Sequence, residues 1–170
     1  MSPAATSVVD LPAVFRTVAS STWVVTTTAP DGTPVGFTAI SIASVSLDPP
    51  LISFNVSRTS SSLPALTASR RCAVHLLAHD QELLARRFAG PAAHRFDDEG
   101  AWGWDEAGVP QLQGAAARLS GAVTAFVEAG DSLLVLAAVE DTRVTGRAPL
   151  VHHARAYHRL PAPGTPTHAA

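Results

Sequence analysis

Hydrophobic and polar positions alternate along much of the chain, and short runs of turn residues separate the alternating stretches. Trp23 to Thr28 is aromatic and β-branched, which is typical of a strand. Pro30-Asp31-Gly32 then supplies turn residues that reverse the chain into a second strand over Val35 to Ser46. A third strand is predicted over 51–56, after a double proline. The first third of the chain therefore predicts antiparallel pairing.

The longest alternating stretches lie in the second half of the chain. Between 115 and 129, Ala, Leu, Gly and Val face one side, while Arg, Ser, Thr and Glu face the other. Gly130-Asp131 makes a turn, and 132–144 returns as a strand rich in Leu, Val and Ala. This pair is predicted to be the core hairpin of an antiparallel barrel. Further strands are predicted over 71–78, 149–153 and 156–160.

Only three short segments show helical spacing. Asp10 is an N-cap candidate for a helix over 11–18 whose apolar residues share one face, and this helix is expected to plug or flank the barrel. The other helices are predicted over 63–69 and over 80–89, where Gly90-Pro91 ends the second. The predicted fold class is therefore mainly β, an antiparallel barrel with a few short peripheral helices.

Residues 91–110 show no sustained period of either kind, although Phe96, Trp102 and Trp104 lie there among acidic residues and glycines. A loop of this length in a compact domain is often a lid or a binding segment. The alternative is a surface loop that the two tryptophans hold in place. Both interpretations stay open, and the segment indicates a long excursion rather than a second domain.

The stretch from Gly36 to Leu51 has an unusual pattern for a strand. Thr38, Ser41, Ser44 and Ser46 place hydroxyl groups at short intervals, with little side-chain bulk between them. Buried hydroxyls need hydrogen-bond partners, so something polar is expected to lie against this stretch. A flat ligand with carbonyl groups and a phosphate fits such a surface. The alternative is an edge strand rich in Ser and Thr, with no ligand.

A second polar run follows the third predicted strand. Ser57-Arg58-Thr59-Ser60-Ser61-Ser62 leads into the predicted helix 63–69, and Ser61 or Ser62 can cap that helix. A hydroxyl-rich loop that enters a helix is a candidate anion site, and the Arg58 guanidinium can hold a phosphate through two hydrogen bonds. Simple helix capping in a solvated turn is the alternative.

Composition narrows the class of protein. A chain of 170 residues fits one domain. The formal net charge is −2, and no basic stripe or cluster interleaved with aromatic residues appears, which argues against nucleic-acid binding. A single cysteine, Cys72, excludes an intramolecular disulfide and suits a buried structural thiol. Because the N-terminus is unlike a signal peptide and no apolar run approaches about 18 residues, we expect a cytoplasmic protein that does not enter a membrane.

Several common catalytic and metal-binding motifs are absent from the sequence. It has neither the Gly-x-Gly-x-x-Gly of a Rossmann fold nor a Walker-type phosphate loop. His75 and His79 are four residues apart, but they straddle a predicted strand end, and the adjacent His152 and His153 face opposite sides of a strand. No nucleophile-elbow sequence is present. We therefore expect no metal site and assign no catalytic residue.

Three motifs together resemble the flavin reductase-like family. They are Gly-Phe-Thr-Ala-x-Ser, then the fairly specific Ser-x-Ser-Leu-Asp-Pro-Pro-Leu, and then Ser57-Arg58-Thr59-Ser60-Ser61 after an apolar strand. The resemblance runs from about Phe15 to Leu160. It implies an FMN-binding split β-barrel of Greek-key type, a homodimer with each flavin in a groove between the subunits, and reduction of FMN or FAD by NADH or NADPH. Reduced flavin would then pass to a partner flavin-dependent monooxygenase.

The resemblance also implies roles for individual residues. The first polar run would contact the isoalloxazine and the ribityl chain of the flavin, and the second run would contact the ribityl end and the phosphate. The cofactor-binding residues implied in this way are Thr38, Ala39, Ile40, Ser41, Asn55, Ser57, Arg58, Ser61 and Ser62.

Two further groups follow from the resemblance. Arg87 and Phe88 end a helix that lies near the flavin in the family, although Phe88 also fits an ordinary core position. Ser132, His152 and Tyr157 would lie on the nicotinamide side. Few acids or bases are needed there, because in hydride transfer the two cofactors carry the chemistry and the protein aligns them.

The sequence departs from the family pattern at three positions. Ser132 follows Gly130-Asp131 where many members have His, Ile40 replaces a residue that is commonly polar, and Arg155 stands where Gly is common. These departures leave two alternatives open. One is a flavin-binding accessory protein without reductase activity, and the other is a split barrel recruited to bind another flat aromatic ligand.

The domain boundaries follow from the same patterns. Residues 1–9 are expected to form a flexible N-terminus and residues 10–160 to form the barrel domain. Residues 161–170 are rich in proline and poor in apolar side chains, so they are expected to be a disordered tail.

Overall fold

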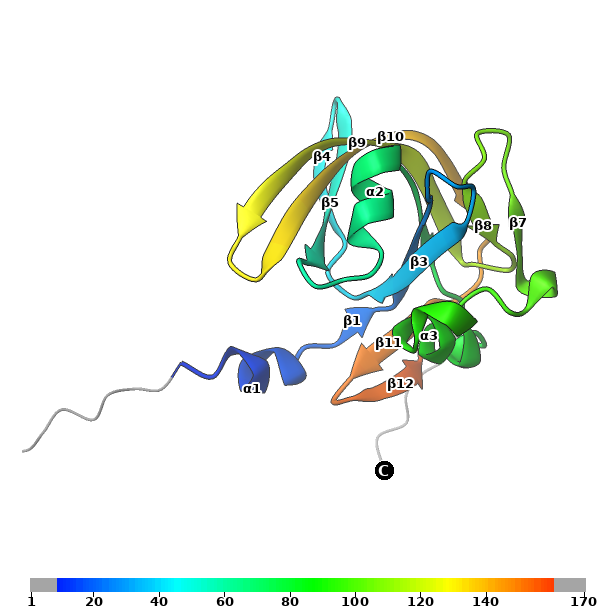
Figure 1. Cartoon of the computed structure of the whole chain (residues 1–170). Coiled ribbons are helices and arrows are strands. Elements are labelled where there is room, and N and C mark those ends of the chain that lie inside the picture. The colour runs from blue at the N-terminus through cyan, green and yellow to red at the C-terminus, as the bar shows by residue number, and fades with distance from the viewer. Residues whose placement is uncertain (1–8, 161–170) are drawn as a thin grey trace, which may run out of the picture.

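Seven strands form one antiparallel sheet in the computed structural model of the protein, which describes residues 9–160 (Figure 1). Strand β2 pairs with β6 and strand β5 pairs with β10, so strands distant in the sequence are neighbours, as in a Greek key. The order across the sheet is β3-β2-β6-β9-β10-β5-β4. The bounds are β2 Trp23–Thr28, β3 Pro34–Ala39, β4 Ala43–Leu47, β5 Pro50–Ser57, β6 Arg71–Leu76, β9 Ala117–Ala129 and β10 Ser132–Val144.

The two edge strands of this sheet are consecutive in the sequence. Only residues 40–42 separate the end of β3 from the start of β4. The Cα atoms of Ala39 and Ala43 are therefore at most about 14 Å apart, four steps of about 3.6 Å. Seven strands laid flat at about 4.8 Å spacing would hold their edges about 29 Å apart. The sheet must curl until β3 and β4 approach, which makes a barrel with a split between its edge strands.

The prediction of one continuous strand over Val35 to Ser46 is wrong. β3 pairs with β2, as the predicted hairpin requires, but β4 pairs with β5 on the opposite edge of the sheet. The ladder breaks at residues 40–42, where the chain changes partner. Alternation of side chains reports which face a residue occupies and carries no information about the neighbouring strand, so it continues across such a break.

The inner face of the barrel holds the main hydrophobic core. Val25, Phe54 and Val135 are fully buried there, at positions whose side chains point inward. Helix α2 (Leu63–Ser69) lies on the concave side of the sheet and adds the fully buried Leu66 (Figure 1). Burial of these apolar side chains is the main favourable term in folding, at about 25 cal/mol per Å².

Cys72 lies in the same core. Its thiol is buried, and burial raises the pKa of the thiol to about 12. A protonated, inaccessible thiol is unreactive. The prediction of a buried structural cysteine is therefore confirmed.

The predicted core hairpin is confirmed as β9–β10, which pairs along its whole length with two register shifts. Gly121 of β9 lies close against the backbone of β10, since a Cβ atom at this position would be 1.9 Å from the carbonyl oxygen of Ala138. Any larger residue there would separate the strands. This hairpin projects beyond the rest of the barrel at its turn (Figure 1).

A second layer lies against the outer side of β2. It consists of helix α3 and a three-stranded sheet in the order β1-β11-β12, and it encloses a smaller core that includes Val24, Leu77 and Phe88. The predicted helix 80–89 and the two predicted C-terminal strands are confirmed with slightly shorter bounds, as α3 Glu82–Ala89, β11 Leu150–His153 and β12 Ala156–Arg159. The third strand of the small sheet, β1 Ser20–Ser21, was not predicted.

The excursion over 91–110 contains more regular structure than the sequence predicts. Two 3-10 turns precede a short antiparallel hairpin that lies over the outer face of β2 and β6. Strands of three residues are too short to give a readable period, which is why the sequence showed none. The bounds are η1 Ala92–His94, η2 Glu99–Ala101, β7 Trp102–Trp104 and β8 Pro110–Leu112.

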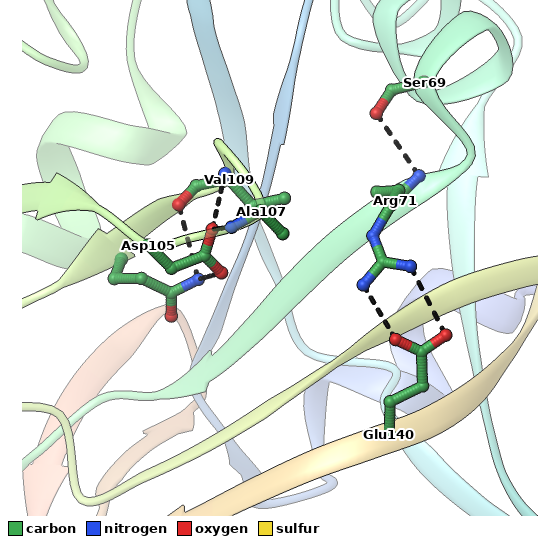
Figure 2. A network of polar contacts seen from close by, with 7 residues as sticks. Ser69, Arg71, Asp105, Ala107, Val109 and Glu140 are labelled. Carbon is green, nitrogen blue, oxygen red and sulfur yellow. Dashed lines mark hydrogen bonds and ion pairs between the residues drawn. The ribbon is translucent and has the colours of Figure 1, made fainter.

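Asp105 organises the turn of that hairpin. Its carboxylate accepts hydrogen bonds from the N–H groups of Ala107 and Val109 at 2.9 and 2.8 Å and from the Gln111 side-chain amide at 2.8 Å (Figure 2). The turn is therefore a defined structure. The β7–β8 hairpin is held against β2 by Thr26, whose Oγ1 donates to the carbonyl oxygen of Pro110 at 2.6 Å.

Figure 2 also shows an ion pair on the outer face of the sheet. Arg71 of β6 contacts Glu140 of β10, with 2.7 Å between Nη2 and Oε2. The two side chains are 41% and 49% exposed. Solvent screening at this exposure limits the contribution of the pair to at most about 1 kcal/mol.

Helix α1 (Leu11–Arg16) begins at the predicted N-cap, where Asp10 Oδ1 accepts a hydrogen bond from Ala13 N at 2.9 Å. None of its residues is buried, and the helix lies away from the barrel (Figure 1). The expectation that this helix plugs or flanks the barrel is wrong for a single chain. Leu11, Val14 and Phe15 are each more than half exposed.

The predicted flexible segment 1–9 falls outside the described residues except for Val9, and the predicted tail 161–170 falls outside them entirely. Within residues 9–160, no helix is both long and apolar enough to cross a bilayer. In the same part of the chain, no three His, Cys, Asp or Glu side chains come together in a way that could hold a metal ion.

His75 is fully buried between β6 and the β7–β8 hairpin. His75 Nδ1 faces the carbonyl oxygen of Val24 at 3.3 Å. His75 Nε2 lies 3.2 Å from the backbone nitrogen of Leu112 and 3.3 Å from Gln111 Oε1. Burial lowers the pKa of His75 to about 4. The neutral ring thus joins β8 to β2.

We predict that His75 makes the fold sensitive to mild acid. Its pKa in the folded state lies below the ordinary 6.5, so the stability contributed by the neutral ring is complete above pH 6.5 and is lost as the pH falls toward 4. The shift corresponds to about 3 kcal/mol of unfolding free energy. Urea unfolding from neutral pH down to about pH 4.5 should show a steeper loss for the wild type than for His75→Gln.

The exposed His94 provides the control for this experiment. His94→Gln should keep the steep loss of the wild type, because His75 is still present and buried in that variant. Equal slopes for wild type and His75→Gln would show that His75 does not carry the effect.

Candidate functional site

The three-residue link at one end of the split carries two predicted site residues. Ile40 is 51% exposed, and Ser41 is exposed beside it. Ser41 Oγ accepts a hydrogen bond from the backbone N–H of Asn55 at 3.3 Å, where β5 extends beyond its pairing with β4. The structure therefore brings Ile40, Ser41 and Asn55 together on one exposed surface.

The two residues before the link are less open. Ala39 is 6% exposed and packs in the main core. The Thr38 hydroxyl donates to the carbonyl oxygen of Ala85 at 2.9 Å and so holds helix α3 against β3. The side chains of Thr38 and Ala39 therefore build the wall of the split.

The backbone of β3 nevertheless faces the split. β3 is an edge strand, and the carbonyl oxygen of Gly36 points away from β2, because it accepts hydrogen bonds from Ser62 and Arg95. Alternate residues of a strand present their backbone groups to the same side, so the N–H and C=O groups of Thr38 also point into the split. A flat ligand with carbonyl groups would find backbone partners there.

The loop over residues 57–62 lies against the turn of the β9–β10 hairpin. Ser57 is opposite Ser132 in the β5–β10 ladder, and the backbone N–H of Arg58 donates to the carbonyl oxygen of Asp131 at 3.0 Å. Ser132 Oγ donates to Asp131 Oδ1 at 3.0 Å. The structure thus places Ser132 beside the predicted phosphate loop and not in the sheet that holds the other predicted nicotinamide residues.

Arg58 already has partners in the single chain. Its Nε donates to the carbonyl oxygen of Gly130 at 3.0 Å, and its Nη2 lies 3.3 Å from the Glu128 carboxylate. The Glu128 side chain is 81% exposed, so the ion pair is weak. A phosphate can therefore compete for Arg58, but it would do so against an existing carboxylate.

Ser61 and Ser62 have different environments. Ser62 occupies the N-cap position of α2, yet its side chain does not cap the helix. It is fully buried, and its Oγ donates to the carbonyl oxygen of Gly36 at 3.4 Å. The sequence offered Ser61 or Ser62 as the cap of this helix. Ser62 holds the N-cap position, but its hydroxyl joins the loop to β3 instead of capping the helix. Ser61 is exposed, and it is the member of the pair that a ligand can reach.

Sequence reasoning assigned no role to Arg95, which joins three segments at this end of the site. Its Nη1 donates to the carbonyl oxygen of Gly36 at 2.6 Å and to Ser62 Oγ at 3.3 Å. Its Nε and Nη2 donate to the carbonyl oxygen of Gly90 at 3.1 and 2.9 Å. These partners lie 59, 33 and 5 residues away in the sequence, and no local pattern could have shown the two distant contacts.

Helix α3 reaches β3 only because residue 36 is a glycine. A Cβ atom at Gly36 would lie 2.9 Å from the ring of Phe88 and 2.9 Å from the carbonyl oxygen of Val25. Phe88 is 1% exposed and stacks edge-on against Phe96 at 5.0 Å. Its side chain therefore occupies the core position that the sequence left open as an alternative.

The remaining predicted residues lie in the second layer. Arg87 pairs with Asp98 at 3.2 Å. His152 and Tyr157 stack edge-on at 5.3 Å, and the Arg86 guanidinium lies over the Tyr157 ring at 5.1 Å. Burial raises the pKa of the Tyr157 hydroxyl. This group belongs to the β11–β12 hairpin and α3, so it is connected to the split through the contact between Thr38 and α3.

The chemistry of this arrangement is that of binding and orientation. Within residues 9–160 the split offers backbone groups, hydroxyls and arginines, and no nucleophile there contacts a general base. Such a surface can hold and align ligands that carry the reactive atoms themselves.

Comparison with known proteins decides the family. Residues 15–161, which are most of the chain, match the sequence model of the flavin reductase like domain. The chain belongs to the flavin reductase like domain family. The sequence motifs that resemble this family lie in the edge strands β3 and β4, at the start of β5 and in the loop after β5.

Two curated relatives illustrate the flavin reductase like family. The NADH:FMN oxidoreductase of Rhodococcus erythropolis is 41% identical over 155 residues, covering 88% of this chain and 80% of that protein. The reductase component of the flavin-dependent trigonelline monooxygenase of Acinetobacter baylyi is 34% identical over 148 residues, covering 87% of this chain and 47% of that protein.

A solved structure shows the same architecture. The NADH:FAD oxidoreductase of Streptomyces globisporus, in complex with NAD and FAD fragments, superposes with a TM-score of 0.85 at 30% identity, over 94% of this chain and 100% of that one. The prediction of a mainly β, antiparallel split barrel is confirmed for this flavin reductase like domain. The individual cofactor and nicotinamide residues remain predictions.

We predict that Gly36→Ala destabilises this flavin reductase like domain. The added methyl group must displace the Phe88 ring or the β2–β3 ladder, and overpacking of this kind costs about 1–3 kcal/mol. Urea unfolding measures the loss. Gly103→Ala is the control, because a Cβ atom there would lie 3.7 Å from its nearest neighbour and fits without rearrangement. Equal stabilities of the two variants would contradict the close approach of α3 to β3.

Proposed function

We propose that this protein is an NADH-dependent flavin oxidoreductase that reduces FMN or FAD. The observation that carries the proposal is the surface of the split. The β3 edge presents the backbone of Thr38, the link presents the hydroxyl of Ser41, and the neighbouring loop presents hydroxyls and Arg58. The names of the relatives, an NADH:FMN and an NADH:FAD oxidoreductase, support this reaction.

The chemical groups along the split match the successive parts of a flavin: the ring system, the ribityl chain and the phosphate. The edge backbone of Thr38, Ala39 and Ile40 and the hydroxyl of Ser41 would address the ring system and the upper ribityl chain. Asn55 and Ser57 continue along β5 toward the loop, where Ser61 and Arg58 would address the phosphate. Ser62 would act indirectly, since its hydroxyl holds the loop against β3.

The nicotinamide side is proposed at the second layer. The bound cofactors supply the hydride donor and acceptor, and the role of the protein is to orient the two rings. His152 and Tyr157 form one stacked unit beside α3, where Arg86 lies over the Tyr157 ring. Arg86 and Arg87 are each paired with a carboxylate, Glu82 and Asp98. The aromatic side chains of this unit would contact the nicotinamide close to the split.

We also propose a homodimer with the flavin groove between subunits. In a single chain, α1 leaves Leu11, Val14 and Phe15 uncovered, and the exposed Ile40 and Leu47 lie at the split and the strand that follows it. A second copy can cover these side chains. It can also bring Ser132 of one subunit toward a nicotinamide unit from which it is separated within its own chain.

Reduced flavin is proposed to pass to a partner flavin-dependent monooxygenase in the cytoplasm. The support for the partner is the relative that is itself the reductase component of a monooxygenase. The cytoplasmic location follows from the proposed use of NADH and agrees with the buried, unpaired Cys72.

A flavin-binding accessory protein without reductase activity is the alternative function. The observation that favours it is Ser132, whose short hydroxyl is already bonded to Asp131 and offers little to a nicotinamide. Flavin binding without reduction is the result that would establish this alternative.

Anaerobic stopped-flow mixing with NADH tests the proposed activity directly. We expect the visible absorbance of oxidised FMN to disappear in a single saturable phase, with NADPH compared in parallel. Flavin that binds but is not reduced by either nucleotide would overturn the reductase proposal. Failure of FMN, FAD and riboflavin to bind at all would overturn the flavin site itself.

We predict that Ser132→His lowers the apparent KM for NADH by about two- to tenfold, because an imidazole adds one hydrogen bond worth about 0.5–1.5 kcal/mol. Steady-state kinetics at saturating FMN would measure this change. Ser132→Ala is the matched control and should leave the KM near the wild-type value, since the wild-type hydroxyl is bonded to Asp131. An unchanged KM in Ser132→His would remove this turn from the nicotinamide site.

A further inference from the structure

The positive charges near the predicted phosphate loop are not equivalent. Arg58 lies 3.3 Å from the Glu128 carboxylate, so its charge is opposed within the chain. Arg95 lies on the other side of the loop, and all its hydrogen-bond partners are neutral: the carbonyl oxygens of Gly36 and Gly90 and the hydroxyl of Ser62. Among the described residues, no carboxylate lies within ion-pair distance of Arg95.

The guanidinium of Arg95 is only partly hydrated. The side chain is wedged between β3, the loop and the end of α3, and burial lowers the pKa of Arg95. An arginine nevertheless stays protonated at physiological pH. A desolvated cation without a counterion is costly, and an anion bound beside it recovers that cost.

The structure provides room for such an anion. Arg95 lines a hollow of about 260 Å³ together with Thr33, Gly36, Ser61 and Ser62, much larger than a single water needs. The four contacts of Arg95 use four of the five N–H groups of a guanidinium, so one N–H on Nη2 remains for a ligand. The Ser61 hydroxyl is exposed at the same hollow.

We infer that Arg95 is the residue that makes this protein prefer a phosphorylated flavin, by placing an unopposed positive charge at the hollow between Ser61 and Gly36. The inference rests on the proposed flavin site in the split. Gly36 lies two residues before Thr38 on β3, and Ser61 lies four residues after Ser57, so the hollow adjoins both predicted walls of that site. The ligand chemistry is a flavin phosphate ester.

The test compares FMN with riboflavin, which differ only in the phosphate. Dissociation constants from flavin fluorescence quenching give the preference of each variant for FMN. Arg95→Gln should reduce this preference about tenfold, as expected for loss of one charge-assisted contact, while the riboflavin affinity changes much less. Arg95→Lys keeps the charge without the forked contacts, and it should recover most of the preference. Arg58→Gln is the matched comparison and should reduce the preference less, because Glu128 already opposes Arg58.

A second pair of variants leaves Arg95 in place, in case its removal disturbs folding. Ser61→Asp puts a carboxylate at the hollow and should abolish the preference for FMN. Thr67→Asp adds the same charge on the exposed side of α2 and should leave the preference unchanged.

The outcomes separate this inference from the proposed function. Equal losses of FMN and riboflavin affinity in Arg95→Gln, without rescue by Arg95→Lys, would show a purely structural role and overturn the inference. A loss of preference confined to Arg58→Gln would overturn it in favour of Arg58. Absence of binding of both flavins by the wild type would instead overturn the flavin site.

Discussion

The fold depends on a link that is too short for a flat sheet. Residues 40–42 connect strands that lie on opposite edges of a seven-stranded ladder, and they can span only about half the distance that a flat sheet would require. The sheet therefore closes on itself, and its two edges meet at a split. Because edge strands keep unpaired backbone groups, closure of this kind leaves a polar seam along the split between β3 and β4.

The seam explains why the hydroxyl-rich stretch occurs where it does. A continuous core strand would not tolerate Thr38, Ser41 and Ser44 at such short intervals. In the structure, Thr38 anchors α3 and Ser41 bonds to the backbone of β5. The small side chains let the edges approach without sealing the seam, and the remaining backbone groups stay available for a ligand.

The two ends of the seam are built from distant parts of the chain. Gly36 is the common point: its lack of a side chain admits Phe88, and its carbonyl oxygen accepts hydrogen bonds from Ser62 and Arg95. The helix, the loop and the excursion after α3 are therefore positioned by one residue of the edge strand. These contacts of Gly36 therefore fix the relative positions of the segments that form the proposed flavin site.

Much of this architecture was predictable from the sequence, because it is local. Turn residues and alternation predicted the β2–β3 and β9–β10 hairpins, and the Asp10 cap predicted where α1 begins. The change of partner at residues 40–42 was not predictable, since the alternation continues through it. The three-residue strands β7 and β8 were too short to show a period.

The predictions for individual site residues also depended on whether the relevant contacts are local in the sequence. Ser41 and Asn55, both expected to contact the flavin, lie on a common surface, because Ser41 accepts a hydrogen bond from the backbone of Asn55. Ser62 and Phe88 turned out to be buried, and Ser132 lies beside Ser57 instead of with His152 and Tyr157. Each of these outcomes depends on a contact between segments more than 25 residues apart, such as the 26 residues between Ser62 and Gly36, which no local pattern encodes.

Hydrogen exchange with and without FMN tests the central claim most directly. If the seam is the flavin site, saturating FMN will slow amide exchange at residues 38–42 and 55–62, while the central strands β6 and β9 exchange as before. Protection confined to the outer face of the sheet, around Arg71 and the β7–β8 hairpin, with no change at the seam, would contradict the account.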